Sequence, residues 1–350
     1  MDNNNQLSRV PQNFSFDKDA LLRTFGEESA IIRDIIVYAA NCQFLDLWGN
    51  ITFSIEDFCR EFGYSRTTLQ RTLPEFKETK KNLPVIDDHV FDSLFEYALY
   101  RALKENVIFK RKKDNKETFE SVQLISHLDV IYDKSTKKLS KRLYSVKLGH
   151  KIIENLFKEY HLIDFYDYKR LKSSKISSVG AFRNFYIFMA RIIAQVRFYE
   201  RSNNPQNFIT SIDDLCDVFG VSVDTPKNKK AYITKTLKHI QESLVNTKFD
   251  WSFVTNGTKH SYFVEFIFSK ETLAYFDEKL KAVFFKKLHS AAEQIYIKEK
   301  GGLISHSSVL DAYRNIDRED FYKWFMSDDS RDKKMKIWND LYSETFGVVE

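Results

Sequence analysis

A short run of arginine, threonine and glutamine residues carries side chains that can read nucleic-acid bases. An arginine can donate two hydrogen bonds to one guanine, which is worth about 1–3 kcal/mol of discrimination against other bases. If Leu69 and Leu73 face inward on one helix, the polar side chains of SRTTLQR face outward. Arg66 and Arg71 are then placed to reach base edges. The candidate DNA-binding residues of this run are Ser65, Arg66, Thr67, Thr68, Gln70 and Arg71.

The residues before this run predict how it is presented. Four apolar residues of SIEDFCREF recur at helical spacing and form one face of a short helix: Ile55, Phe58, Cys59 and Phe62. Gly63 can end that helix, because glycine takes the left-handed conformation without a Cβ penalty. Ser65 can then cap the next helix through its hydroxyl. Two helices joined by a glycine turn, the second rich in Arg, Thr and Gln, are typical of a helix-turn-helix.

The same pattern occurs again much later in the chain. SIDDLCDVFGVS at 211–222 aligns without a gap with SIEDFCREFGYS at 54–65, and a basic helix follows each copy. One copy could be an ordinary core helix and turn, but two copies favour two similar domains. The candidate DNA-binding residues after the second turn are Lys227, Asn228, Lys229, Lys230, Tyr232 and Lys235.

We expect the two basic helices to act together. Joined by a short linker, they should occupy successive major grooves about one helical turn apart, so that a monomer protects roughly two turns. The fragments 1–173 and 174–350 should each bind weakly, because the tether makes the second contact effectively intramolecular. The alternative is that one copy has lost DNA contact and serves in dimerisation.

Basic hairpins accompany both copies. VIFKRKKDNKETFESVQLI and LDVIYDKSTKKLSKRLYSV each read as strand, turn and strand, and Asn256-Gly257 is a strong hairpin signal. A lysine-rich tip is most often simply solvated, but beside a helix-turn-helix it is also typical of a DNA-contacting wing. The sequence leaves open which of the first two hairpins is the wing. The candidate wing residues are Lys112, Lys113, Lys134, Lys137, Lys138 and Lys259.

Length and composition indicate a globular, intracellular protein. The 350 residues are 43% hydrophobic and allow two or three domains. The net charge of +5 is compatible with a polyanionic partner. The three cysteines lie far apart, which argues against a disulfide framework and for a cytoplasmic location. No apolar run reaches the length of a membrane span, and the polar N-terminus lacks a signal-peptide core.

The familiar catalytic motifs are missing from the sequence. Glycine spacing excludes a P-loop and GxGxxG, and the scattered histidines exclude HExxH. No cysteine pair has zinc-site spacing. Asp213, Asp214 and Asp217 fall in the first turns of the repeated helix, where carboxylates favour the positive end of the dipole. We therefore expect no enzyme activity, no cofactor and no metal, although a carboxylate site assembled from distant residues stays open.

The predicted fold class is α+β and mainly helical, with two tandem winged-helix domains and a helical C-terminal segment. Longer helices are expected over 27–47 and 88–105. KRLKSSKISS is the best candidate for a linker, because it is short, polar and basic. The predicted parts are a flexible arm at 1–25, a first winged-helix domain at 26–168, a linker at 169–178, a second winged-helix domain at 179–269 and the C-terminal segment at 270–350.

In their order, these patterns resemble the Rep-type initiators of theta-replicating, iteron-bearing plasmids. The stretches that carry the resemblance are LISHLDVIYDKSTKKLSKRLYSVKLG, SVGAFRNFYIFMARII, ITSIDDLCDVFGVS, LKHIQESLVNTKFDWSFV and YFVEFIF. The resemblance covers about 27–269, and the chain departs from the family pattern at 74–116 and in its C-terminal segment. It implies an initiator that binds repeated double-stranded origin sites, helps to melt nearby DNA and recruits host replication proteins. In such families a homodimer often represses its own gene.

Two other functions stay open. A winged-helix transcription regulator without an origin role would use the same DNA-binding parts, and a small-ligand pocket in the C-terminal segment would favour it. Tandem winged helices that bridge one long site favour the initiator. A more distant alternative is an enzyme of a phage or mobile element.

Overall fold

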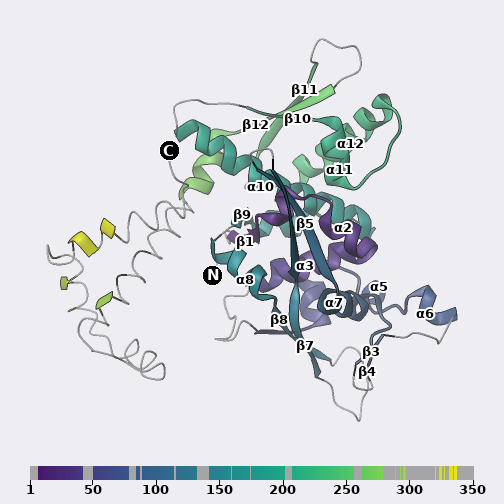
Figure 1. Ribbon diagram of the computed structural model, residues 1–350. Coiled ribbons are helices and arrows are strands. Elements are labelled where there is room, and N and C mark those ends of the chain that lie inside the picture. Colours follow the sequence, from purple (N-terminus) through teal and green to yellow (C-terminus); the bar gives the residue numbers. More distant parts are fainter. Residues whose placement is uncertain are drawn as a thin grey trace. The chain divides into compact units, whose positions relative to one another are not determined.

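The chain forms two compact units, Met1–Thr272 and Leu273–Glu350 (Figure 1). This computed structural model describes residues 7–41, 50–78, 84–86, 89–113, 116–131, 142–158, 160–173, 175–201, 207–255 and 262–278. Between 288 and 336 it describes scattered residues, most of them helical. Most of the predicted C-terminal segment therefore lies outside the described residues.

Residues 7–25 are part of the folded first unit, so the predicted flexible arm is wrong for them. β1 (Leu7–Pro11) pairs antiparallel with β9 (Tyr160–Asp164). Two short helices follow, α1 (Asn13–Phe16) and α2 (Ala20–Phe25). Four of their apolar residues are buried in the core: Phe14, Ala20, Leu21 and Phe25. The strand partner of β1 lies about 150 residues away, beyond the reach of local sequence signals.

The first half of the unit contains a three-stranded sheet with strand order β2-β8-β7. The predicted helix at 27–47 is present from Ser29 to Asn41, preceded by the 3₁₀ turn Gly26–Glu28. The elements that make up this half are α3 (Ser29–Asn41), β2 (Asn50–Ser54), α4 (Ile55–Phe62), α5 (Arg66–Leu69), β7 (Ile125–Ile131) and β8 (Leu143–Leu148).

The second half repeats this order of helix, strand, helix, helix and hairpin. Its sheet has strand order β10-β12-β11, so the strand before the helix pair again joins the last strand of the hairpin. The α+β class is thus confirmed. The elements are α10 (Ile176–Arg201), β10 (Phe208–Ser211), α11 (Ile212–Phe219), α12 (Pro226–Ser243), β11 (Phe249–Thr255) and β12 (Tyr262–Phe268).

A long insertion separates α5 from β7 in the first half. The predicted helix at 88–105 begins only at Leu94, where the Ser93 hydroxyl accepts a hydrogen bond from the Glu96 N–H, and β4 occupies the residues before it. The β5–β6 hairpin forms its own two-stranded sheet and bonds to the N-terminal segment through Asn13–Glu120. The inserted elements are α6 (Pro74–Glu78), β3 (Val85–Ile86), β4 (His89–Val90), α7 (Leu94–Lys104), β5 (Asn106–Lys113) and β6 (Lys116–Gln123).

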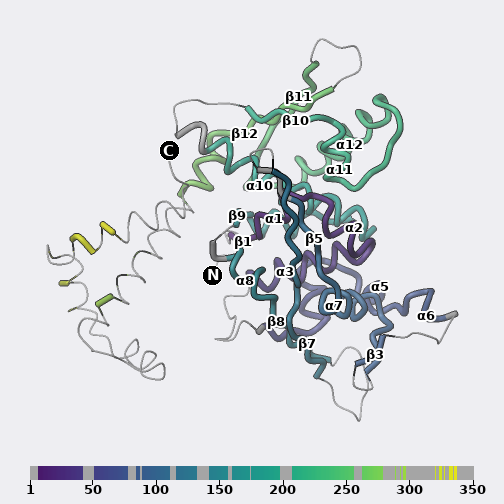
Figure 2. Tube along the Cα trace, in the orientation of Figure 1, coloured from purple at the N-terminus to yellow at the C-terminus, as the bar shows by residue number. Residues whose placement is uncertain are grey.

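The chain passes from the first half to the second through α8 (His150–Lys158), β9 and α9 (Phe165–Arg170). Of the predicted linker at 169–178, the first two residues belong to α9 and those from Ile176 onward to α10. Leu171 between them is buried. The described residues between the two helices are thus only 171–173 and 175, and α10 packs against both α3 and β9 (Figure 2).

A buried polar cluster joins the two halves. Arg183 of α10 is completely buried and forms an ion pair with Asp34 of α3. The Tyr64 and Tyr168 hydroxyls donate to the same carboxylate at 2.7 and 2.6 Å, and Arg183 Nη2 donates to the Phe62 carbonyl at 2.9 Å. Burial, reinforced by the charge of Asp34, raises the pKa of both tyrosines well above the usual value. The cluster therefore fixes α10, the first helix of the second half, to α3 and to the end of α4 in the first half.

A second buried carboxylate, on α9, binds the residues that follow α12. Asp167 is completely buried, and its oxygens accept hydrogen bonds from the N–H groups of Val245, Asn246 and Thr247 at 2.8, 3.1 and 2.7 Å. The α12–β11 connection is therefore anchored to α9, which precedes the second half.

His161 on β9 should make the protein less stable in acid. Burial, together with the nearby charge of Arg191, lowers the pKa of His161 to about 3. An unfolded histidine titrates near 6.5, so the unfolded state binds the extra proton between those values, and stability falls as the pH drops through this window. We expect wild type to lose about 2 kcal/mol through this group between pH 7 and 5.

Urea unfolding of His161→Phe at the two pH values tests this expectation. The variant should lose that much less stability than wild type, whereas replacement of the exposed His150 by Phe should leave the wild-type difference unchanged. Equal losses in wild type and His161→Phe would contradict the assignment.

Candidate nucleic-acid interface

The two repeated turns have the same construction. Ser54 accepts a hydrogen bond from the Asp57 N–H at 3.1 Å, and Ser211 accepts one from the Asp214 N–H at 3.0 Å. α4 ends at Gly63 with φ +70°, and α11 ends at Gly220 with φ +65°. Both glycines are in the left-handed region, which was predicted for Gly63. The predicted apolar face of the first helix is confirmed as buried, and so is its counterpart at Ile212, Leu215, Cys216 and Phe219.

The helices that follow the turns differ in length. α5 has 4 residues and α12 has 18. Ser65 lies at the N-cap of α5, but its side chain makes no capping hydrogen bond, so the predicted cap is wrong. α5 ends because the chain turns away, with Thr72 pairing with Ser93 and Pro74 opening α6. The two helices that were expected to be equivalent therefore differ in length, 4 residues against 18.

The polar residues of α5 are presented around a single turn. The Arg66 side chain is 47% exposed and forms an ion pair with Glu56 of α4. Its Nε also donates to the Gln70 side chain at 3.2 Å. Ser65, Thr67 and Arg71 are exposed, and Thr68 and Gln70 are half-buried.

α12 presents a long basic face. Thr225 accepts a hydrogen bond from the Asn228 N–H, and Pro226 occupies the first turn. Ile233, Leu237 and Ile240 are buried on its inner side. We define the α12 face by six exposed residues: Lys227, Asn228, Ala231, Thr234, Lys235 and Lys238. Three cations alternate there with small and neutral side chains, an arrangement that suits contact with phosphates and base edges together.

Three of the predicted residues on α12 are engaged within the protein. Lys229 Nζ lies 2.6 Å from an Asp213 oxygen. Lys230 Nζ lies 4.7 Å from the ring centroids of both Phe253 and Tyr262, and so connects α12 to the β11–β12 hairpin. Tyr232 packs edge-on against Phe219, with ring centroids 6.0 Å apart.

The sequence-based prediction omitted three members of the α12 face, Ala231, Thr234 and Lys238. Their signal was helical spacing, because Lys235 and Lys238 are three residues apart and share one side of the helix. The prediction took the residues nearest the turn instead of following one face along the helix.

Topology distinguishes the two hairpins of the first half. β8 pairs with β2 as β12 pairs with β10, which makes β7–β8 the counterpart of β11–β12. Lys112 and Lys113 lie at the end of β5, in the hairpin that has no counterpart in the second half. The four other wing candidates, Lys134, Lys137, Lys138 and Lys259, lie outside the described residues.

Two of the three acidic residues of α11 form ion pairs. Asp213 pairs with Lys229, and Asp214 pairs with Lys18 at 2.9 Å. Among the described residues, no group of three or more His, Cys, Asp or Glu could hold a metal ion. Cys59 and Cys216 are free and buried, and burial raises the pKa of Cys59 to about 11. Within the described ranges, every helix is too short or too polar to cross a membrane.

Comparisons with known proteins find likeness to solved structures but none to a family model or a curated protein. A solved structure, that of a Pi initiator protein in complex with iteron DNA, is similar to 77% of this chain and 99% of its own. The sequences are 14% identical and the TM-score is 0.41, which is too low to establish a shared fold.

Proposed function

We propose that this chain is a sequence-specific double-stranded DNA-binding protein that initiates plasmid replication at repeated origin sites. The observation that carries the DNA-binding part is the α12 face, an exposed basic surface that follows a capped helix and glycine turn and is joined to a β-hairpin through Lys230. In this proposal both halves are winged helices.

The α12 face enters the major groove. Lys227, Lys235 and Lys238 contact phosphates, while Asn228 and Thr234 reach base edges between them. The N-terminus of α12 adds the positive end of the helix dipole, which favours the approach of a phosphate. Residues of β11–β12 and β7–β8 contact the flanking backbone as wings.

The first half makes the smaller contribution to base reading. α5 offers one turn, and Arg66 must exchange its ion pair with Glu56 for a base or phosphate contact. Because the Arg183–Asp34 pair ties the two halves together, both contacts are set at one spacing along the DNA. A test of this arrangement must use the whole chain, since a cut between 173 and 174 would separate the two partners of this buried pair.

The initiator role rests on the order of the sequence patterns that resemble plasmid initiators. On this proposal the protein acts in the cytoplasm without catalytic activity, uses no cofactor, recruits host replication proteins to the origin and forms a homodimer. Footprinting on a plasmid that carries repeats beside the gene tests it, and the initiator should protect each repeat. Protection of a single promoter site, with replication unaffected by deletion of the gene, would instead identify a transcription regulator.

The affinity for DNA should fall steeply with salt. Each neutralised phosphate contributes about −0.9 to the slope of log K against log salt, so the three lysines of the α12 face alone should give a slope of about −3. Lys238→Ala should make the slope shallower by about 1. Fluorescence anisotropy between 50 and 200 mM salt measures both slopes, and a flat curve for wild type would contradict phosphate contact.

A further inference from the structure

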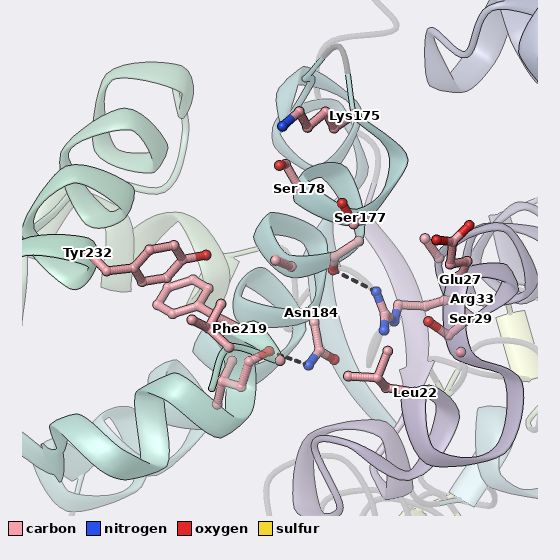
Figure 3. A pocket seen from close by; sticks show the side chains of 17 residues that line it. Leu22, Glu27, Ser29, Arg33, Lys175, Ser177, Ser178, Asn184, Phe219 and Tyr232 are labelled. Carbon is pink, nitrogen blue, oxygen red and sulfur yellow. Dashed lines mark hydrogen bonds between the residues drawn. The ribbon is translucent and has the colours of Figure 1, made fainter. Parts of the chain in front are cut away.

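A cavity of about 510 Å³ lies between the two halves of the first unit. Residues of α2, the following turn and α3 line one side, and the N-terminal turns of α10 line the next (Figure 3). The turn after α11 and Tyr232 of α12 complete it. α3 and α10 meet closely beside it, since a Cβ on Gly180 would lie only 2.9 Å from the Ala30 Cβ.

Arg33 is a buried cation in the wall of this cavity. Its residue is 3% exposed, and Nη1 donates to the Gly180 carbonyl at 2.8 Å. Its Nε has no hydrogen-bond partner within the described part of the chain. No described carboxylate lies within ion-pair distance of it, and the neighbouring Asp34 is already bonded to Arg183 and two tyrosines.

An uncompensated buried guanidinium is energetically costly, typically by several kcal/mol. Glu27 is the carboxylate that lines the cavity, but it is exposed and lies beyond ion-pair distance of Arg33. A ligand that supplies the missing negative charge would remove this cost.

The other polar groups of the cavity favour an anion as well. Ser177 and Ser178 lie in the first turn of α10, where backbone N–H groups have no helical partner and the dipole is positive. Lys175, just before that turn, adds a second cation. Tyr232 and Phe219 form an aromatic wall on the opposite side, separated from Arg33 by Asn184 (Figure 3).

We propose that this cavity binds a small phosphate ester of mononucleotide size, with the phosphate at Arg33 and the start of α10 and the planar group near Tyr232 and Phe219. The volume is within the usual range of ligand pockets, about 300–1,000 Å³. Hydroxyl, backbone and guanidinium donors together match a phosphate, which accepts several hydrogen bonds at once.

Such a ligand also contacts the DNA-reading helix from its inner side. Tyr232 belongs to α12, and Arg33 belongs to α3, so one bound molecule touches both halves. The site is distinct from the α12 face, which points to solvent. Binding can therefore be measured without DNA, and failure of this proposal can be told apart from failure of the DNA-binding proposal.

Isothermal titration of the full chain with adenosine monophosphate and with inorganic phosphate tests the proposal. We expect saturable binding of the nucleotide at one site, with phosphate at least tenfold weaker and competitive. Arg33→Met should weaken nucleotide binding at least tenfold while the free protein stays folded, because removing an unpaired buried charge is not destabilising. Arg60→Met, which removes an exposed arginine from α4, is the matched control and should bind like wild type.

A second variant tests the site independently, in case Arg33→Met does not fold. Ser177→Asp places a carboxylate in the first turn of α10, where it is favourable for the helix, and should abolish nucleotide binding. The proposal is overturned if neither probe binds wild type, or if both bind Arg33→Met with wild-type affinity. If wild type binds neither probe and Glu27→Gln unfolds at a lower urea concentration than wild type, Glu27 is the counter-ion of Arg33 instead of a ligand.

Discussion

Asp34→Ala should destabilise the first unit by about 3–5 kcal/mol, as expected when one partner of a buried ion pair is removed. The substitution leaves Arg183 fully buried with no carboxylate, and it removes the acceptor of the Tyr64 and Tyr168 hydroxyls. Urea unfolding at neutral pH measures the loss directly.

Two companion variants separate the charge from the packing. Asp34→Asn keeps one oxygen, which can accept from one of the two tyrosines, and should cost less than Asp34→Ala. The double variant Asp34→Leu with Arg183→Met should be more stable than Asp34→Ala, because it buries neither charge. A loss below about 1 kcal/mol for Asp34→Ala would mean that Arg183 reaches water in solution, as surface pairs do.

Replacement of Lys227, Lys235 and Lys238 together by alanine should lower the affinity for specific DNA about 100-fold. If each lysine contributes about 1 kcal/mol through a charge-assisted contact, the sum of about 3 kcal/mol corresponds to roughly that factor. The stability of the protein should not change, because all three side chains are exposed. Anisotropy titration with a fixed duplex and a fixed salt concentration gives the ratio.

A charge-matched control removes three other exposed lysines, Lys104, Lys110 and Lys248. It should lower affinity only a few-fold, since these side chains act through the overall field. Equal losses of affinity in both triple variants would contradict direct contact between the α12 face and DNA. Thr234→Ala and Arg66→Ala then compare the two halves, and we expect the larger change of sequence preference from α12.

The sequence by itself determined where several helices begin and end. Ser54 and Ser211 cap their helices, Gly63 and Gly220 end them, and Pro226 opens α12, because each role depends on backbone groups within a few residues. The apolar faces of α4 and α11 follow in the same way from helical spacing. The repeat within one chain made these local signals stronger than either copy alone.

The tertiary structure decided everything that depends on residues far apart. β1 is a strand because β9 lies beside it, and α5 is one turn because the insertion draws the chain away to Ser93. Lys230 lies outside the exposed α12 face, because its ammonium group is held near two aromatic rings of the β11–β12 hairpin. The partners of Asp34 come from α10, α9 and the turn after α4, and Arg33 donates to the Gly180 carbonyl of α10. No spacing along the chain encodes such contacts, since they exist only once folding has brought the segments together.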